Sequence, residues 1–232
     1  MKLIYKTLIV VSLFLFSVSV NAQLGDKYVA EFRGGINFSE MDIAGANMYK
    51  QSKVGFHISS AFGVRLIGPL YAQTGLGLTK KGLKQHDKSI QRQDATGIIT
   101  KRDIRTTIDA NYIQLPLMLG LEFPIKKDWI VNIYGGGYAA YGFKGKWTVE
   151  GTETRDPDSS DPVVYDRSEA EVDTFDYGRL KKFDYGLIGS VGLVVDIFSF
   201  NLGYEYGLYN VSDNASRELK NRNATFSVGI RF

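Results

Sequence analysis

The chain has 232 residues, of which 28 are basic and 25 acidic, and a formal net charge of +3 at pH 7. A charge so close to balance gives no reason to expect nucleic acid as a partner. The chain contains no cysteine, which excludes disulfides and thiolate metal sites, and we expect no cofactor.

The N-terminus has the pattern of a bacterial export signal. A short basic start precedes an apolar run over residues 7–20, and Ala22 ends a small-x-small motif of the kind that signal peptidase cleaves. We predict cleavage before Gln23, so that residues 1–22 form a signal peptide and residues 23–232 the mature domain. The apolar run is too short for a transmembrane helix, and no later stretch approaches 18 consecutive apolar residues.

Eight segments of the mature chain show strict alternation of apolar and polar residues. In the first segment Tyr28 and Phe32 lie on one face, and Glu31 lies on the other. A period of two indicates β-strands, and most segments supply the length of about 9–11 residues that a tilted transmembrane strand needs. The segments cover residues 28–39, 54–66, 70–79, 112–123, 129–143, 183–196, 198–208 and 223–232.

Lipid cannot satisfy open backbone hydrogen bonds, so spanning strands must close on themselves. The predicted fold is therefore all-β, an eight-stranded antiparallel up-and-down transmembrane β-barrel. The fifth segment is the least regular, because Gly135-Gly136-Gly137 interrupts its apolar face. We expect a bulge or a change of register at these glycines.

The connections alternate between short and long. Three joins are short, at residues 67–69, 124–128 and 196–197. Short turns on one rim and long loops on the other are typical of outer-membrane barrels, in which the short turns are periplasmic. We therefore predict a bacterial outer-membrane location with both termini periplasmic. The remaining joins are predicted to be long, polar extracellular loops, at residues 40–53, 83–105, 147–182 and 209–221.

The polar face of the segments is rich in Gly and Ser and carries several charges. A soluble lipocalin-like barrel would turn its apolar face inward instead, but a water-facing surface would gain nothing from the glycines. Eight strands leave an interior only wide enough for side chains. We therefore expect small residues to make room for charges that pair across the lumen, namely Glu31, Arg33, Arg65, Glu122, Asp184, Glu205 and Arg231.

The C-terminus and two internal stretches point to a family. Alternation continues to the terminal Phe232, as in outer-membrane barrels whose last aromatic residue is read by the barrel-assembly machinery. Residues 111–117 read NYIQLPL, and residues 184–192 read DYGLIGSVG. With the signal peptide, these stretches resemble the PorT-type, porin-family outer-membrane β-barrels of Bacteroidetes over essentially the whole mature chain. The resemblance implies an integral barrel, in some members a component of type IX secretion, and brings no catalytic residues.

A catalytic reaction in the barrel would need a general base that works near neutral pH, and the two histidines of the chain are the candidates. His57 lies on the polar face with Ser59, and a carboxylate such as Asp184 would complete a hydrolytic arrangement. Lipid-modifying barrels need their site on the lipid-facing side, whereas His57 faces inward. His86 lies in a basic stretch without an obvious partner. We therefore expect a lumen histidine and no catalytic residue.

Two polar stretches of opposite sign offer binding chemistry. Residues 80–105 are basic and residues 150–176 are acidic. The two stretches could pair with each other, or the basic one could meet the anionic lipopolysaccharide surface. Asp156, Asp158 and Asp161 could bind calcium, but the Gly and terminal Glu of a calcium loop are missing, so a solvated acidic loop is favoured and no metal site is predicted.

These features predict a non-enzymatic outer-membrane barrel that acts in envelope structure or binds a partner through its extracellular loops. Its expected partners are outer-membrane lipid and lipopolysaccharide, the barrel-assembly machinery during insertion, and a protein partner that the sequence does not identify. A small pore or accessory factor for secretion is the alternative, and a lipid-modifying enzyme is the second alternative.

Overall fold

A computed structural model describes residues 27–43, 50–93, 98–156, 163–176, 179–214 and 218–232. The predicted signal peptide and its cleavage point at Ala22 and Gln23 lie outside these residues. None of the described residues forms a helix that is long and apolar enough to cross a membrane.

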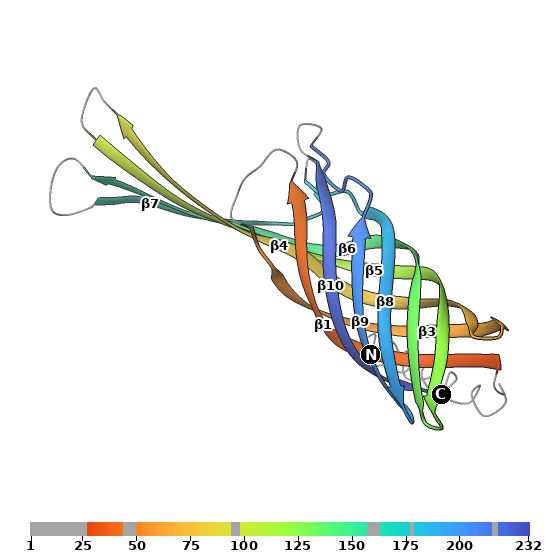
Figure 1. The fold of residues 1–232 in the computed structure, drawn as a ribbon. Coiled ribbons are helices and arrows are strands. Elements are labelled where there is room, and N and C mark those ends of the chain that lie inside the picture. The colour runs from red at the N-terminus through yellow and green to blue at the C-terminus, as the bar shows by residue number, and fades with distance from the viewer. Residues whose placement is uncertain (1–26, 44–49, 94–97, 157–162, 177–178, 215–217) are drawn as a thin grey trace, which may run out of the picture.

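The described chain forms ten β-strands (Figure 1), and eight of them close into a ring. Hydrogen-bonded neighbours follow the order β1, β3, β4, β5, β6, β8, β9 and β10, and β10 pairs with β1 to complete the circle. All pairings are antiparallel, so the predicted eight-stranded up-and-down barrel is confirmed. The strands are β1 Tyr28–Ile43, β2 Lys50–Gln51, β3 Lys53–Ile67, β4 Leu70–Gln93, β5 Ile98–Lys126, β6 Trp129–Asp156, β7 Val163–Val172, β8 Phe183–Val195, β9 Phe198–Gly207 and β10 Leu219–Arg231.

The barrel closes where the two ends of the chain meet. β10 pairs with β1 from Glu31 opposite Arg231 to Ile43 opposite Leu219. Phe232 adds one more pair, since its N–H donates to the Ala30 carbonyl at 2.8 Å and its carbonyl accepts from the Ala30 N–H at 3.2 Å. The predicted assembly residue therefore lies at the seam that completes the barrel.

Three tight turns join strands at the rim where β1 begins and β10 ends. The turn between β3 and β4 has Gly68 at φ +54°, and the turn between β8 and β9 has Asp196 at φ 55°. This left-handed conformation suits glycine and is tolerated by aspartate, which is why these residues stand at the turns. The third turn joins β5 to β6 at Lys127 and Asp128.

At the other rim, two predicted loops are strands instead. β4 and β5 pair without a break out to Gln93 opposite Ile98, and β5 and β6 pair out to Ile99 opposite Asp156. β7 adds a fourth strand along β6. The expectation of loops at 83–105 and 147–182 is therefore wrong over residues 83–93, 98–105, 147–156 and 163–172. Both faces of a sheet that leaves the membrane meet water, so polar residues there do not argue against strands.

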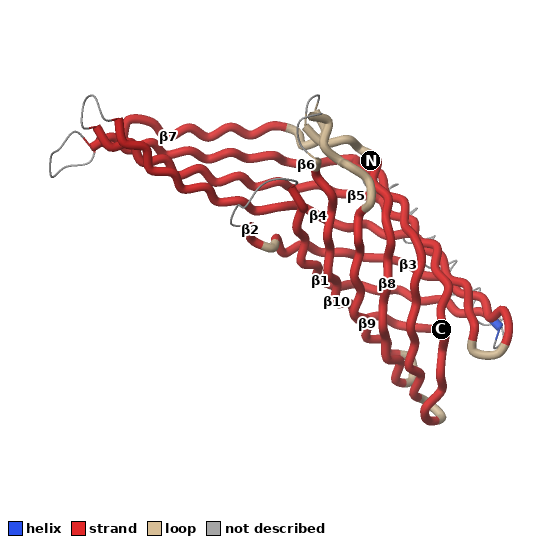
Figure 2. The backbone as a smooth tube through the Cα atoms, turned by 45° about the horizontal axis from the view of Figure 1, so that its top comes forward, coloured by secondary structure: helices blue, strands red, loops and turns tan. Residues whose placement is uncertain are grey.

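We call this extension the projecting sheet and define it as the outer parts of β4, β5 and β6, from residues 84–93, 98–107 and 148–156, together with β7. Figures 1 and 2 show it extending well past the barrel rim, with β7 along one border. The other two predicted loops are shorter than expected, because β1 runs to Ile43 and β10 begins at Leu219.

The bulge predicted at Gly135–Gly137 is absent. β6 keeps one continuous register there with both β5 and β8, and the shifts on β5 fall at Asn111/Tyr112 and Pro124/Lys126. The middle glycine is needed for close strand approach: a Cβ on Gly136 would lie 2.1 Å from the Leu117 carbonyl oxygen. A Cβ on Gly135 would meet nothing within 4 Å. Gly136 faces the lumen, and Gly135 faces outward.

The two faces of the wall divide by polarity as predicted. Leu117, Ile58 and Phe56 are each more than 60% exposed on the outside. The inside buries polar side chains, among them Glu31, Asn37, Gln73, Lys81, Gln114, Glu122, Asn132, Asp184, Asn201, Glu205 and Asn223. An apolar exterior around a polar interior is the arrangement of a membrane barrel and the reverse of a soluble one.

Candidate functional site

The lumen near the tight-turn rim holds two buried ion pairs. Glu31 accepts from Arg33 through two contacts of 2.6 Å and also from Asn201 at 3.1 Å and from the Ser199 hydroxyl. Glu122 accepts from Arg231 at 2.9 and 2.5 Å and from the Tyr134 hydroxyl at 2.6 Å. These extra donors compensate the removal of the carboxylates from water.

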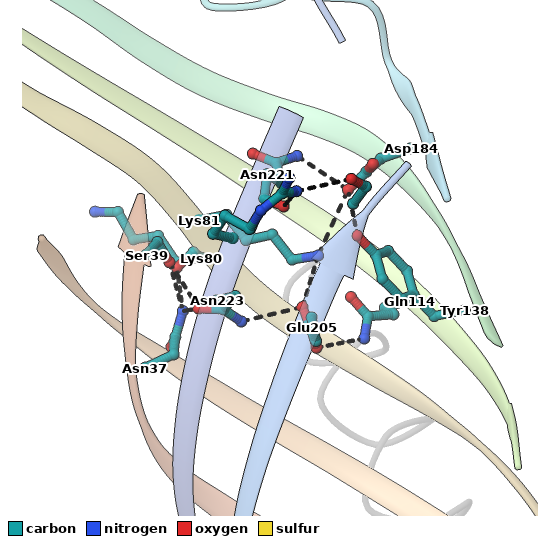
Figure 3. A network of polar contacts seen from close by, with 12 residues as sticks. Asn37, Ser39, Lys80, Lys81, Gln114, Tyr138, Asp184, Glu205, Asn221 and Asn223 are labelled. Carbon is teal, nitrogen blue, oxygen red and sulfur yellow. Dashed lines mark hydrogen bonds and ion pairs between the residues drawn. The ribbon is translucent and has the colours of Figure 1, made fainter. Parts of the chain in front are cut away.

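A second charged layer lies higher in the lumen and centres on Lys81 (Figure 3). Its Nζ lies 2.8 Å from Glu205 Oε2 and 3.6 Å from Asp184 Oδ2. The Lys81 and Asp184 side chains are fully buried. Lys81 also lies 4.3 Å above the Tyr138 ring, so the ammonium group is held by carboxylates and by an aromatic face.

Amide and phenol groups satisfy the carboxylates of this layer. Glu205 accepts from Gln114 at 2.7 Å and from Asn223 at 3.1 Å. Asp184 accepts from Asn221 at 2.9 Å and from the Tyr138 hydroxyl at 3.2 Å. The contacts come from β4, β5, β6, β8, β9 and β10, so the network ties together most of the barrel wall (Figure 3).

The structure places the seven predicted lumen charges in separate groups rather than in one cluster. Six of them form the two ion pairs and the acidic side of the Lys81 layer. Arg65 stands apart near the tight-turn rim, where its Nε donates to the Tyr71 hydroxyl at 2.9 Å and its guanidinium lies 5.4 Å from that ring.

Lys81 is the lumen charge that the sequence reasoning missed, because it was assigned to the basic loop. A signal was available: Lys81 continues the same alternating row as Gln73, Gly75, Gly77 and Thr79, all on the inward face of β4. Asp109 was missed as well, and it contacts both Lys53 and Lys80 near the outer end of the barrel.

An apolar cluster covers the barrel mouth between the Lys81 layer and the projecting sheet. Met41, Leu83, Ile108, Leu180, Val211 and Leu219 are buried in it, and Trp147, Phe175 and Tyr209 pack against it. Tyrosines fill the levels below: Tyr112 and Tyr138 pack with alanines, and Tyr71 and Tyr134 with Val29 and Met118. Side chains therefore fill the lumen at these levels.

A cavity of about 100 Å³ remains inside the barrel, and His57 and Ser59 both line it. Asp184, the carboxylate considered for a hydrolytic arrangement, bonds to Tyr138 and Asn221 instead. His57 Nδ1 lacks a hydrogen-bond partner among the described residues. The structure thus brings His57 and Ser59 to one cavity on the lumen side and does not assemble a triad there.

The histidine and acidic residues outside the lumen form ordinary surface contacts. His86 Nε2 lies 2.6 Å from Asp103 Oδ1, and Lys88 and Arg105 each lie 3.8 Å from the same carboxylate. Within the part of the chain that the structure describes, no three His, Asp or Glu side chains are placed to hold a metal ion. The considered calcium loop falls largely outside that part.

The basic and acidic stretches lie side by side in the projecting sheet through backbone pairing. The register places Arg105 of β5 opposite Glu150 of β6. Between β6 and β7, Lys146 contacts Glu171 at 2.5 Å with both side chains about half exposed. Opposite charges on neighbouring strands support such pairing, although exposed pairs add little.

Several solved structures are similar to the chain at low sequence identity. Among solved structures, the attachment invasion locus protein Ail of Yersinia pestis is 12% identical, with 89% of this chain and 99% of that chain covered and a TM-score of 0.38. Neisserial surface protein A is 13% identical, with coverages of 87% and 95% and a TM-score of 0.33. The translocator domain of the autotransporter NalP from Neisseria meningitidis is 10% identical, with coverages of 95% and 94% and a TM-score of 0.28.

No curated protein matches the chain. The family model described as the outer membrane protein beta-barrel domain matches residues 21–213, which is most of the chain. The chain therefore belongs to the outer membrane protein beta-barrel domain family and is a β-barrel protein of the bacterial outer membrane.

Proposed function

We propose that this chain is a non-enzymatic barrel that binds a partner outside the cell through its projecting sheet, while its lumen stays closed to solutes. The observation that carries the proposal is the continuity of β4, β5 and β6 from the barrel wall into the sheet. Strands anchored in the wall hold a binding surface rigidly, which lowers the entropy lost on binding.

The proposed orientation puts the sheet outside the cell and both termini in the periplasm. The predicted export through the inner membrane supports it, and so do the three tight turns on the rim where β1 begins and β10 ends. In this orientation Phe232 meets the barrel-assembly machinery from the periplasm. The apolar wall contacts outer-membrane lipid, and the basic part of β4 lies near the lipopolysaccharide surface.

The packed lumen argues against a pore. A solute would have to displace the Lys81 layer and the apolar cluster at the mouth, and separating a buried ion pair costs several kcal/mol. A role as an accessory factor for secretion is compatible with a closed barrel and remains an alternative. The finer resemblance to PorT-type barrels of Bacteroidetes, which rests on residues 111–117 and 184–192, stays a prediction.

A lipid-modifying activity is disfavoured because His57 and Ser59 face the lumen rather than the lipid. Comparison of lipid A by mass spectrometry, with and without overproduction of the protein, would overturn this part of the proposal if a modified species appeared.

Photo-crosslinking in living cells tests the proposed binding role. A photoreactive amino acid is placed at Lys88 or Arg105, whose side chains are 69% and 63% exposed on the projecting sheet. The control position is Leu117, which is 67% exposed on the barrel wall. We expect crosslinked polypeptide adducts from the two sheet positions and none from Leu117. The absence of adducts from both sheet positions would contradict the proposal.

A trimmed variant serves as the second control. Residues 86–105 and 150–169 are each replaced by an Asn-Gly turn, joining Gln85 to Thr106 and Val149 to Ala170, which are paired partners in the structure. We expect the trimmed barrel to insert and to lose the partner of the full-length protein, measured by co-purification after crosslinking at the retained Lys84.

A further inference from the structure

Both borders of the projecting sheet are open strand edges. Beyond its two pairs with β2 at Lys84 and Gln85, the outer part of β4 pairs with β5 alone, and β7 pairs with β6 alone, within the described part of the chain. An open edge presents a row of unpaired N–H and C=O groups and can add another strand.

The directions of the two edge strands suit pairing between neighbouring copies. β4 follows a tight turn at Gly68 and runs away from that rim, whereas β7 follows the outer hairpin and runs back toward the barrel. All copies in one membrane have the same orientation relative to the membrane. The β4 edge of one copy beside the β7 edge of the next is therefore antiparallel, the arrangement that two strands pair in most readily.

The two edges also carry opposite charge. Beyond β2, residues 86–93 of β4 hold two basic residues and one acidic residue, and β7 holds three acidic residues and one basic residue. Two β4 edges carry the same sign of charge and repel each other, and so do two β7 edges. A β4 edge and a β7 edge carry opposite charge and attract each other. The charge pattern disfavours both symmetric pairings and favours the unsymmetric one.

We propose that copies of this chain associate through their projecting sheets, with β4 of one copy paired antiparallel to β7 of the next. The inference rests on the proposed binding role of the sheet and identifies its partner as a second copy. Each copy offers one edge of each kind, so the contact is head to tail and builds rings or open rows rather than closed two-fold dimers.

The registers and the charges together select which residues meet. Lys84 already pairs with Gln51 of β2, so the open part of the β4 edge begins beyond Gln85. One row across the sheet runs Lys88, Asp103, Thr152 and Arg167, so a neighbouring sheet at the same height would place two cations side by side. A shift of two residues instead brings Lys88 of one copy opposite Glu169 of the next, and the Lys88 side chain is 69% exposed.

The absence of cysteine from the chain allows a clean disulfide test. The full-length double variant K88C/E169C is produced in outer membranes and oxidised. Within one copy the two positions are three strand spacings apart, at least about 14 Å, which is too far for an internal disulfide. We expect a ladder of dimers, trimers and larger species on non-reducing gels, and monomers alone for K88C and for E169C.

The matched control is K88C/K127C, which moves the second cysteine to the opposite rim and should give no ladder. Heat-dependent migration on gels verifies that every variant is folded. Disulfides in either single variant, or a K88C/E169C sample that stays monomeric, would overturn head-to-tail pairing. If the photo-crosslinks at Lys88 and Arg105 then still join a different polypeptide, the sheet binds a foreign partner and the proposed function survives. If these photo-crosslinks are also missing, both the head-to-tail pairing and the proposed function fail.

Discussion

At the scale of single residues, Lys81 shows how a charge becomes part of the interior of a membrane barrel. It stands between Glu205 and Asp184 at 2.8 and 3.6 Å and is fully buried. Burying one charge without partners is very unfavourable, but here two carboxylates, three amides and a phenol stabilise the buried charges. The lysine lies between two acids on the neighbouring strands β8 and β9, and these acids would otherwise repel each other.

Replacing Lys81 by Met should therefore destabilise the barrel strongly. Two buried carboxylates would lose their cation, and breaking such a contact typically costs about 3–5 kcal/mol. The matched control is Lys80→Met, since the neighbouring Lys80 side chain is 41% exposed beside Asp109 and should contribute about 1 kcal/mol or less. Urea unfolding of the refolded protein in detergent measures both changes. Equal losses for the two variants would contradict the role assigned to the Lys81 layer.

At the scale of elements, the wall strands can be predicted from the alternation of apolar and polar residues, because each strand has lipid on one side and a narrow lumen on the other. Tyr28, Phe32 and Leu117 must face outward and Glu31 inward, so period two is enforced by the surroundings. Outside the membrane this constraint disappears. Residues such as Thr106, Thr107 and Thr148 favour strands only through their β-branched side chains. This preference is a weaker signal than alternation, and the polarity of these stretches led to their assignment as loops.

The same reasoning explains which parts of the site were predictable. Glu31, Glu122, Asp184 and Glu205 were found because they interrupt apolar strands at inward positions. Arg33 and Arg231 were predicted as lumen charges too, but which charge pairs with which was not predicted, since the pairing of Arg231 with Glu122 depends on barrel closure between the first and last strands. Lys81 was missed because the strand that carries it continues past the expected boundary.

The adjacent glycines of β6 offer a test of wall geometry. Gly136→Ala should disrupt pairing with β5, because the new Cβ would lie 2.1 Å from the Leu117 carbonyl oxygen, whereas Gly135→Ala points into open space. We expect Gly135→Ala to refold as the parent does and Gly136→Ala to lose at least about 2 kcal/mol, in line with overpacked interiors. Refolding into lipid vesicles, followed by heat-dependent gel migration, compares them. Similar yields and stabilities would contradict the described facing of the two glycines.

At the scale of the whole molecule, the barrel is a closed anchor and the projecting sheet is its accessible surface. The lumen holds two ion pairs, the Lys81 layer, two tyrosine layers and an apolar cluster at the mouth. The sheet rises from three of the same strands that form the wall (Figure 2), so a force on the sheet is transmitted directly to the barrel.

A closed lumen predicts that the protein does not conduct ions across a bilayer. Purified protein reconstituted into planar bilayers should give no stable current steps, because an eight-stranded interior filled by side chains leaves no continuous water path. Large, reproducible single-channel steps that disappear with a control preparation lacking the protein would contradict a packed lumen and favour the pore alternative.

The most direct test of the account is the location of the projecting sheet on intact cells. Single-cysteine variants K88C on the sheet and K127C in the turn between β5 and β6 are treated with a maleimide that cannot cross the outer membrane. The account predicts rapid labelling at position 88 and labelling at position 127 only after the cells are opened. Labelling of position 127 but not of position 88 on intact cells would contradict it.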